Sequence, residues 1–169
     1  MIRFILGGAS AGKTRFAINS ALKYPEKRIY IATGIPIDNE MERKIEKHKR
    51  ERGDNFITWE EPYNISSLLK RVTSDIKVVV LDCLTIWSGN VLLKDKDPLK
   101  EAKKFLDLFQ KLHMDIPFFV VSNEVGMGII PDNRLSRQYR EILGEINILF
   151  SQVADEVYFM VAGIPWRIK

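Results

Sequence analysis

Residues 7–14 are Gly7-Gly8-Ala9-Ser10-Ala11-Gly12-Lys13-Thr14, and this stretch matches the phosphate-loop pattern G-x-x-x-x-G-K-[ST]. An apolar run, Ile2–Leu6, precedes it and a helical pattern follows, which is the strand–loop–helix order that the motif requires. Glycines let successive N–H groups face phosphate oxygens, and the helix adds the positive end of its dipole. We expect Lys13 to contact the β- and γ-phosphates of a nucleotide and Thr14 to contact Mg²⁺. The alternative, a chance glycine-rich turn with a surface lysine, does not account for the flanking pattern.

A second signal lies at residues 77–82, where an apolar strand pattern ends in Asp82. A carboxylate at the carboxyl end of a buried strand can reach the metal ion held at a phosphate loop. Many buried strands end in aspartate for turn formation alone, and that alternative stays open. At least one further expected strand lies between the two signals in the sequence, which favours a RecA-like arrangement.

Short apolar runs alternate with longer amphipathic stretches along the chain, a pattern typical of an α/β domain. The expected strands are Ile2–Leu6, Arg28–Thr33, Asn55–Trp59, Lys77–Leu81, Pro117–Ser122, Glu156–Val161 and a short edge strand at Pro165–Lys169. The expected helices are Lys13–Lys23, Asp38–Arg52 with Asp38 as N-cap and Gly53 as stop, Ile65–Thr73, Thr85–Leu93, Pro98–His113 and Asn133–Val153. The sequence therefore predicts one P-loop NTPase domain over residues 1–169, with a mostly parallel sheet flanked by helices.

Composition narrows the class of protein further. The formal net charge of +4 suits a phosphate-rich small ligand and is too small to indicate nucleic acid. The first residues show neither a signal-peptide nor a membrane-span pattern. The single cysteine, Cys83, allows no intrachain disulfide. These features predict a cytoplasmic protein without a membrane or nucleic-acid partner.

His48 lies in a strongly charged helical stretch. Helical spacing aligns it with Met41, Ile45 and Arg52, so the imidazole continues an inward-facing stripe. The surrounding basic residues are expected to disfavour the imidazolium form and to keep the ring neutral, as a nucleophile requires. Considered alone, a half-buried structural histidine is the simpler interpretation. The other histidine, His113, is expected near a helix end, where the helix dipole explains it.

Several segments form an ordered set along nearly the whole chain. They are Gly7–Thr14, Tyr30–Thr33, Asp38–Met41, Lys44–His48, Trp59–Pro62, Leu81–Thr85, Val121–Arg134, Ala154–Tyr158 and Gly163–Pro165. The most specific part is Asn123-Glu124-Val125-Gly126-Met127-Gly128-Ile129, which generic P-loop proteins have no reason to carry. Together these segments resemble the adenosylcobinamide kinase/guanylyltransferase family of cobalamin biosynthesis. The chain departs from the family pattern at Ser10-Ala11, where Arg-Ser is common, and at Lys44, where Arg is common.

This resemblance implies two activities. One is transfer of the γ-phosphate of ATP or GTP to the aminopropanol hydroxyl of adenosylcobinamide. The other is guanylyl transfer, in which a histidine attacks the α-phosphate of GTP, pyrophosphate leaves, and GMP passes to adenosylcobinamide phosphate to give adenosylcobinamide-GDP. The guanylylated histidine of the family corresponds to His48 here. The resemblance also implies a homo-oligomer, with a trimer expected.

The resemblance further implies which residues bind nucleotide. They are the phosphate loop, in which Lys13 is also catalytic, and Ala32, Thr33, Gly34, Lys49, Arg50, Glu51, Arg52, Glu60 and Asp82. Thr14 and Asp82 are the expected contacts of Mg²⁺. One phosphate loop, one metal-directed carboxylate and one histidine nucleophile suffice for both steps.

Alternatives stay open at this point. A P-loop kinase of another small metabolite needs the same loop but no reactive His48. A RecA-like nucleic-acid-binding ATPase is disfavoured because no continuous basic stripe with interleaved aromatic residues is evident. The glycines and apolar side chains of residues 123–131 suit contact with a corrinoid, with an ordinary packed loop as the alternative. The apolar positions of residues 133–153 predict core or subunit contact.

Overall fold

The computed structural model describes residues 1–112 and 115–169. They form a seven-stranded sheet in the order β3-β2-β4-β5-β1-β6-β7. The strands are β1 (Ile2–Gly7), β2 (Arg28–Ala32), β3 (Ile57–Glu60), β4 (Val78–Asp82), β5 (Phe118–Val121), β6 (Glu156–Val161) and β7 (Ile164–Arg167). The neighbouring strands pair in parallel except for β6 with β7, which are antiparallel. The expected mostly parallel sheet is therefore confirmed, and β7 is the expected edge strand.

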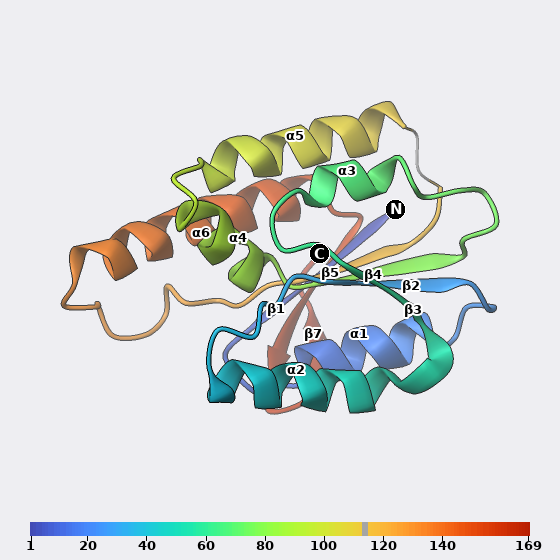
Figure 1. Cartoon of the computed structure of the whole chain (residues 1–169), viewed down its shortest axis with the longest axis horizontal. Coiled ribbons are helices and arrows are strands. Elements are labelled where there is room, and N and C mark those ends of the chain that lie inside the picture. The colour runs from blue at the N-terminus through green and yellow to red at the C-terminus, as the bar shows by residue number, and fades with distance from the viewer. Residues whose placement is uncertain (113–114) are drawn as a thin grey trace.

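Helices cover both faces of the sheet (Figure 1). On one side lie α1 (Lys13–Ala21) and α2 (Asn39–Arg52), and on the other α3 (Ile65–Leu69), α4 (Leu84–Leu92), α5 (Pro98–Lys111) and α6 (Arg134–Val153). No helix among the described residues is both long enough and apolar enough to cross a bilayer.

Most elements lie within one or two residues of their expected bounds, and one helix differs more. The helix expected at Ile65–Thr73 ends at Leu69. The strand expected at Asn55–Trp59 begins at Ile57, because Gly53–Asn55 form a 3₁₀ turn after α2. The helix end expected at His113 lies outside the described residues.

The ends of α2 follow the sequence prediction closely. The Asp38 side chain accepts a hydrogen bond from the backbone N–H of Met41 at 2.7 Å, which satisfies one of the free donors of the first turn. Gly53 ends the helix with a φ of 52°, a conformation that costs glycine little. These two caps therefore define the helix that carries His48.

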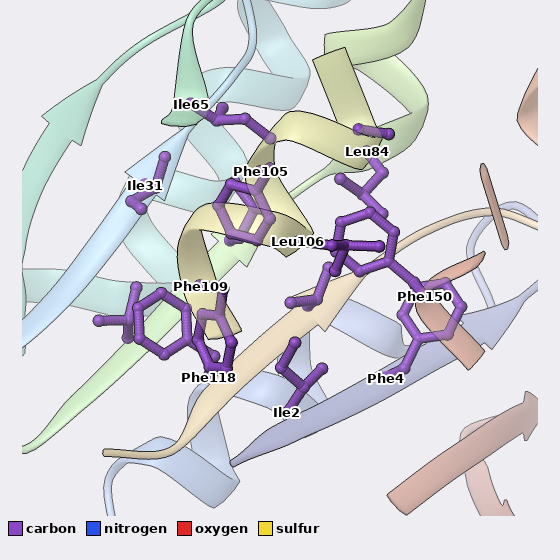
Figure 2. Close-up of a cluster of buried hydrophobic side chains, with 14 of the residues drawn as sticks. Ile2, Phe4, Ile31, Ile65, Leu84, Phe105, Leu106, Phe109, Phe118 and Phe150 are labelled. Carbon is purple, nitrogen blue, oxygen red and sulfur yellow. The ribbon is translucent and has the colours of Figure 1, made fainter. Parts of the chain in front are cut away.

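Two apolar cores hold the layers together, one on each face of the sheet. The larger core packs α3–α6 against the sheet and is rich in phenylalanine (Figure 2). Within it the ring of Phe150 lies 5.7 Å from that of Phe4 and 5.8 Å from that of Phe105, measured between centroids. The smaller core lies under α1 and includes Ile5, which directly follows Phe4 in β1. Because successive strand side chains point to opposite faces, burial on both sides explains the continuous apolar runs in the sequence.

Replacing Phe150 by alanine tests the larger core. The side chain is fully buried between α6 and the sheet, so we expect Phe150→Ala to lower the free energy of unfolding by about 3–5 kcal/mol. Ile148 lies on the same helix with 58% of its surface exposed, and Ile148→Ala is expected to cost less than about 1 kcal/mol. Denaturant unfolding measures both. Equal losses from the two variants would contradict this description of the core.

Candidate active site

The phosphate loop joins the end of β1 to the start of α1. Gly7 has a φ of 149°, and a Cβ atom there would lie 2.6 Å from the carbonyl oxygen of Met160, so only glycine suits this position. Lys13 curls back over the loop, and its Nζ donates to the carbonyl oxygen of Gly8 at 2.5 Å. Burial lowers the pKa of Lys13, and a bound phosphate would favour its charged form again. The loop thus holds a buried cation ready for a phosphate.

Asp82 ends β4 and faces the first turn of α1. Its Oδ2 accepts a hydrogen bond from Thr14 Oγ1 at 3.0 Å, and its side chain is only 5% exposed. In the sheet β5 lies between the strand of the phosphate loop and the strand of Asp82. The structure therefore brings the two sequence signals, which are 68 residues apart, into direct contact.

The same carboxylate oxygen accepts two further hydrogen bonds. One comes from the hydroxyl of Tyr30, and the other from His48 Nδ1 at 3.0 Å. Burial alone would raise the pKa of Asp82, but the hydrogen bonds from His48, Tyr30 and Thr14 hold it below its usual value. Asp82 is therefore ionised and gathers side chains from α1, α2 and β2 around one point.

The surroundings of His48 shift its pKa in the direction opposite to the one that the sequence analysis expects. The hydrogen bond to Asp82 raises the pKa of His48, although burial acts in the opposite direction and the nearby Lys47 opposes the rise only weakly. The expectation that basic neighbours disfavour the imidazolium form was therefore wrong in direction, because a carboxylate at 3.0 Å outweighs Lys47 on the solvated helix face. The contact also orients the ring, since donation from Nδ1–H leaves Nε2 as the nitrogen with a lone pair.

Tyr30 is a site residue that the sequence analysis missed. It lies within the buried strand β2, and its ring packs under the guanidinium of Arg52 at 4.7 Å. Arg52 Nε also donates to Thr58 Oγ1 at 3.1 Å, so Arg52 supports the Tyr30–Asp82 contact from behind. The signal in the sequence was the tyrosine itself, two positions before the end of a mostly apolar strand. Such a buried hydroxyl needs a hydrogen-bond partner.

The chain is similar to known proteins along nearly its whole length. Residues 3–168 match the family described as cobinamide kinase / cobinamide phosphate guanyltransferase. The chain belongs to this family. It is 36% identical to the bifunctional adenosylcobalamin biosynthesis protein CobP of Pseudomonas aeruginosa, over 98% of this chain and 95% of that protein. It is 32% identical to the bifunctional adenosylcobalamin biosynthesis protein CobU of Escherichia coli K12, over the full length of both.

A solved structure shows the same fold outside the family. It is a prototypical ATPase from the type III secretion system of pathogenic bacteria, with a TM-score of 0.56 and 8% identity. The match covers 95% of this chain and 51% of that one. At this identity the likeness concerns the fold alone, and it confirms the expected RecA-like P-loop NTPase fold.

The other residues that the family resemblance predicts to bind nucleotide lie around this centre at different depths. Thr33 is fully buried, and its Oγ1 donates to the carbonyl oxygen of Cys83 at 2.9 Å while accepting from the Cys83 N–H at 2.8 Å. It thus braces the turn after Asp82. Ala32 and Gly34 flank it and are half-buried. The remaining members are exposed, namely Lys49, Arg50 and Glu51 on α2 and Glu60 at the end of β3.

A second loop approaches the site from β5. The backbone N–H of Glu124 donates to the carbonyl oxygen of Gly7 at 3.0 Å, which ties this loop to the start of the phosphate loop. The backbone N–H of Asn123 donates to Thr85 Oγ1 at 2.7 Å, at the first turn of α4. Asn123 and Glu124 therefore lie beside the phosphate loop, on the side away from His48 that α4 and α6 cover.

The donor set at the centre suits Mg²⁺. Thr14 supplies a hydroxyl oxygen and Asp82 a carboxylate oxygen, the hard ligands that this ion prefers. Within residues 1–112 and 115–169 no group of three or more His, Cys, Asp or Glu side chains could hold a metal ion. That agrees with Mg²⁺ chemistry, because Mg²⁺ keeps several waters and binds through one or two protein oxygens plus substrate phosphates.

The charge state of His48 provides a test of this geometry. We expect Asp82→Asn to lower the pKa of His48 in metal-free buffer, because the hydrogen-bonded negative charge is lost while burial of the ring remains. NMR titration of the imidazole C–H signals measures this. Asp75→Asn removes an exposed carboxylate paired with Lys27 and should leave His48 unchanged.

The raised pKa of His48 also predicts how the stability of the fold changes with pH. The folded-state pKa of His48 lies above its ordinary value of 6.5, so the protonated ring stabilises the fold below that pH. This contribution is lost as the pH rises through the folded-state pKa.

The NMR titration has a result that would contradict the described contact. An unchanged His48 pKa in Asp82→Asn would show that the two side chains do not interact.

Proposed function

We propose that this protein phosphorylates adenosylcobinamide with a nucleoside triphosphate and then transfers GMP from GTP, through a guanylylated His48, to adenosylcobinamide phosphate. Residues 1–169 would act as one nucleotide-binding catalytic domain. The observation that carries the proposal is the contact of His48 with the carboxylate that also meets Thr14 of the phosphate loop. A plain kinase needs the loop and the carboxylate but no histidine at this point.

In the kinase step the aminopropanol hydroxyl oxygen attacks the γ-phosphorus. The new O–P bond forms as the bond to the β-phosphate oxygen breaks, the nucleoside diphosphate leaves, and the hydroxyl proton passes to solvent or a nearby carboxylate. Lys13 neutralises charge on the β- and γ-phosphates, and backbone N–H groups of residues 7–14 hold the oxygens. Positioning and charge neutralisation are the main contributions that proteins make to this chemistry.

In the guanylyl step Nε2 of His48 attacks the α-phosphorus of GTP. An N–P bond forms, the bond to the β-phosphate oxygen breaks, and pyrophosphate leaves. A phosphate oxygen of adenosylcobinamide phosphate then attacks the same phosphorus, and the N–P bond breaks to release the histidine. Asp82 stabilises the positive charge that develops on the ring during the attack, as a carboxylate does for a catalytic imidazole elsewhere.

Mg²⁺ is part of this proposal. Thr14 and Asp82 would hold it, and when bound it would neutralise phosphate charge and orient the leaving group. ATP and GTP are the proposed phosphate donors, and we place the protein in the cytoplasm.

The proposal also includes a homo-oligomer, with a trimer expected. An exposed apolar surface on the β6–β7 hairpin supports it, comprising Val161, Ile164, Trp166 and Ile168, each more than half exposed. Trp166 pairs with Phe159, so strand alternation puts Ile164, Trp166 and Ile168 on one face of the sheet. Exposed apolar patches of this kind mark contact surfaces.

Labelling with GTP separates the proposed function from a plain kinase. Wild-type protein incubated with Mg²⁺ and GTP labelled at the α-phosphate should carry an acid-labile, alkali-stable label, as a phosphorus–nitrogen bond requires. His48→Ala should abolish the label and keep phosphorylation of cobinamide by ATP. Lys13→Ala should lower both by about 100-fold, because the loop charge serves both steps.

Each other outcome points to a different function. Label retained in His48→Ala would exclude this histidine as the acceptor. No label on the wild type would favour a kinase of a small metabolite with an inert His48. Salt-sensitive retention of single-stranded DNA on filters would favour the nucleic-acid-binding ATPase.

A further inference from the structure

The segment between β5 and α6 leaves the sheet beside the phosphate loop. Its start is tied to that loop by the hydrogen bond from the Glu124 N–H to the carbonyl oxygen of Gly7. Figure 1 shows the segment extending past the edge of the sheet where the strands end, away from α1 and α2. A molecule lying against this segment would reach the terminal phosphate of a nucleotide from the side opposite to His48.

The backbone of this segment is braced at both ends. The Gly126 N–H donates to Glu124 Oε1 at 2.6 Å, and Arg140 Nη2 donates to the carbonyl oxygen of Gly126 at 2.5 Å. At the far end Arg137 Nη1 donates to the carbonyl oxygen of Pro131 at 2.9 Å. A Cβ atom at position 126 would lie 2.8 Å from Glu124 Oε1, so a larger residue there would displace the Glu124 side chain from its hydrogen bond. The segment is therefore held to α6 near both of its ends.

Between these anchors the loop presents apolar side chains to solvent. Met127 is 80%, Ile129 95% and Ile130 67% exposed, and Leu135 on the first turn of α6 is 52% exposed. Single exposed apolar residues are common on proteins, but several together on one anchored loop mark a surface that binds something.

A groove of about 440 Å³ lies between Glu124, at the start of the segment, and the later turns of α6. Its lining is mostly apolar, with hydrogen-bonding groups from Glu124, Asn147, Ser151 and Gln152. The Asn147 amide donates to the carbonyl oxygen of Asn123 at 3.0 Å, but its Oδ1 is buried with no partner among the described residues. A buried acceptor without a donor is costly, and an ordered water would relieve the cost.

We propose that loop 125–131 and this groove bind the corrinoid substrate on the acceptor side of the site, with the apolar loop against the macrocycle and the groove around its amide side chains. This inference rests on the proposed function. The apolar loop and the polar groups of the groove both suit a corrinoid, because a corrin ring is a large flat apolar body with carboxamides at its rim. Those carboxamides can hydrogen-bond with the Glu124, Ser151 and Gln152 side chains that line the groove. The tie to Gly7 puts the bound molecule next to the phosphates, as phosphoryl transfer requires.

A second copy of this chain is the less suitable occupant of the loop. The β6–β7 hairpin already offers an exposed apolar surface for contact between subunits. Contact between two copies of the chain at the loop is an alternative that the experiment below distinguishes.

The test is a double variant, Met127→Ser with Ile129→Ser, compared with Leu93→Ser. Leu93 lies on the turn after α4 and is 71% exposed, so it matches the loop residues in exposure without lying beside Glu124. Equilibrium dialysis measures the Kd for adenosylcobinamide by its visible absorbance, and self-labelling with α-labelled GTP is measured without corrinoid. We expect the double variant to raise the Kd for adenosylcobinamide about tenfold or more, because two apolar contacts are lost. The self-labelling rate should stay within twofold, and Leu93→Ser should change neither.

The outcomes distinguish this inference from the proposed function. Absence of self-labelling in the wild type would count against guanylyl transfer, while the dialysis result would still decide the corrinoid site. An unchanged Kd in the double variant would overturn the inference, and so would a wild type that binds no adenosylcobinamide. A drop in molecular mass of the double variant by light scattering would instead assign the loop to subunit contact.

Discussion

The carboxylate of Asp82 is the interaction on which the rest of the site depends. One buried oxygen accepts hydrogen bonds from the phosphate loop, from the adjacent strand β2 and from helix α2. A buried negative charge is stable only when it is paired or well hydrogen-bonded, so these three partners are required by the burial itself. The ends of β4 and β1, the first turn of α1 and the histidine of α2 therefore share one anchor.

Helix α2 shows how much this anchor matters. The helix is strongly polar, and Arg52 is its one buried residue within the described chain. Its position depends on a few contacts: the caps at Asp38 and Gly53, the packing of Ile45 against Gly34, and the stacking of Arg52 on Tyr30. Since apolar burial contributes little here, the contact between His48 and Asp82 has a large share in orienting the helix. Function and local structure are thus coupled through one hydrogen bond.

The sequence predicts this centre only in part, and the reason is physical. The phosphate loop and Asp82 are visible because each follows a buried apolar strand, and parallel strands end at one edge of a sheet. The direction of the His48 pKa shift is not visible, since the carboxylate that causes it comes from β4, 34 residues away, while only the neighbouring lysines appear in the local sequence. Tyr30 was missed for the same reason, because a tyrosine in an apolar strand indicates core packing until its partner is known. The start of β3 was predicted two residues too early, because Asn55 belongs to a 3₁₀ turn of Gly53–Asn55, residues that favour turns over strands.

The topology also separates two sides of the site. β4 and β5 lie in the middle of the sheet, with β2 leading to α2 on one side and the β5–α6 loop opening on the other. A nucleotide on the phosphate loop would lie between them, with the histidine reaching it from α2 and the acceptor from the α6 side. Under the proposed function, chemistry at two phosphates of one nucleotide would need no second nucleotide site, because the two attacking groups would approach from different sides. In such an arrangement the single loop determines where the phosphates lie, and the two flanking elements determine which of them reacts.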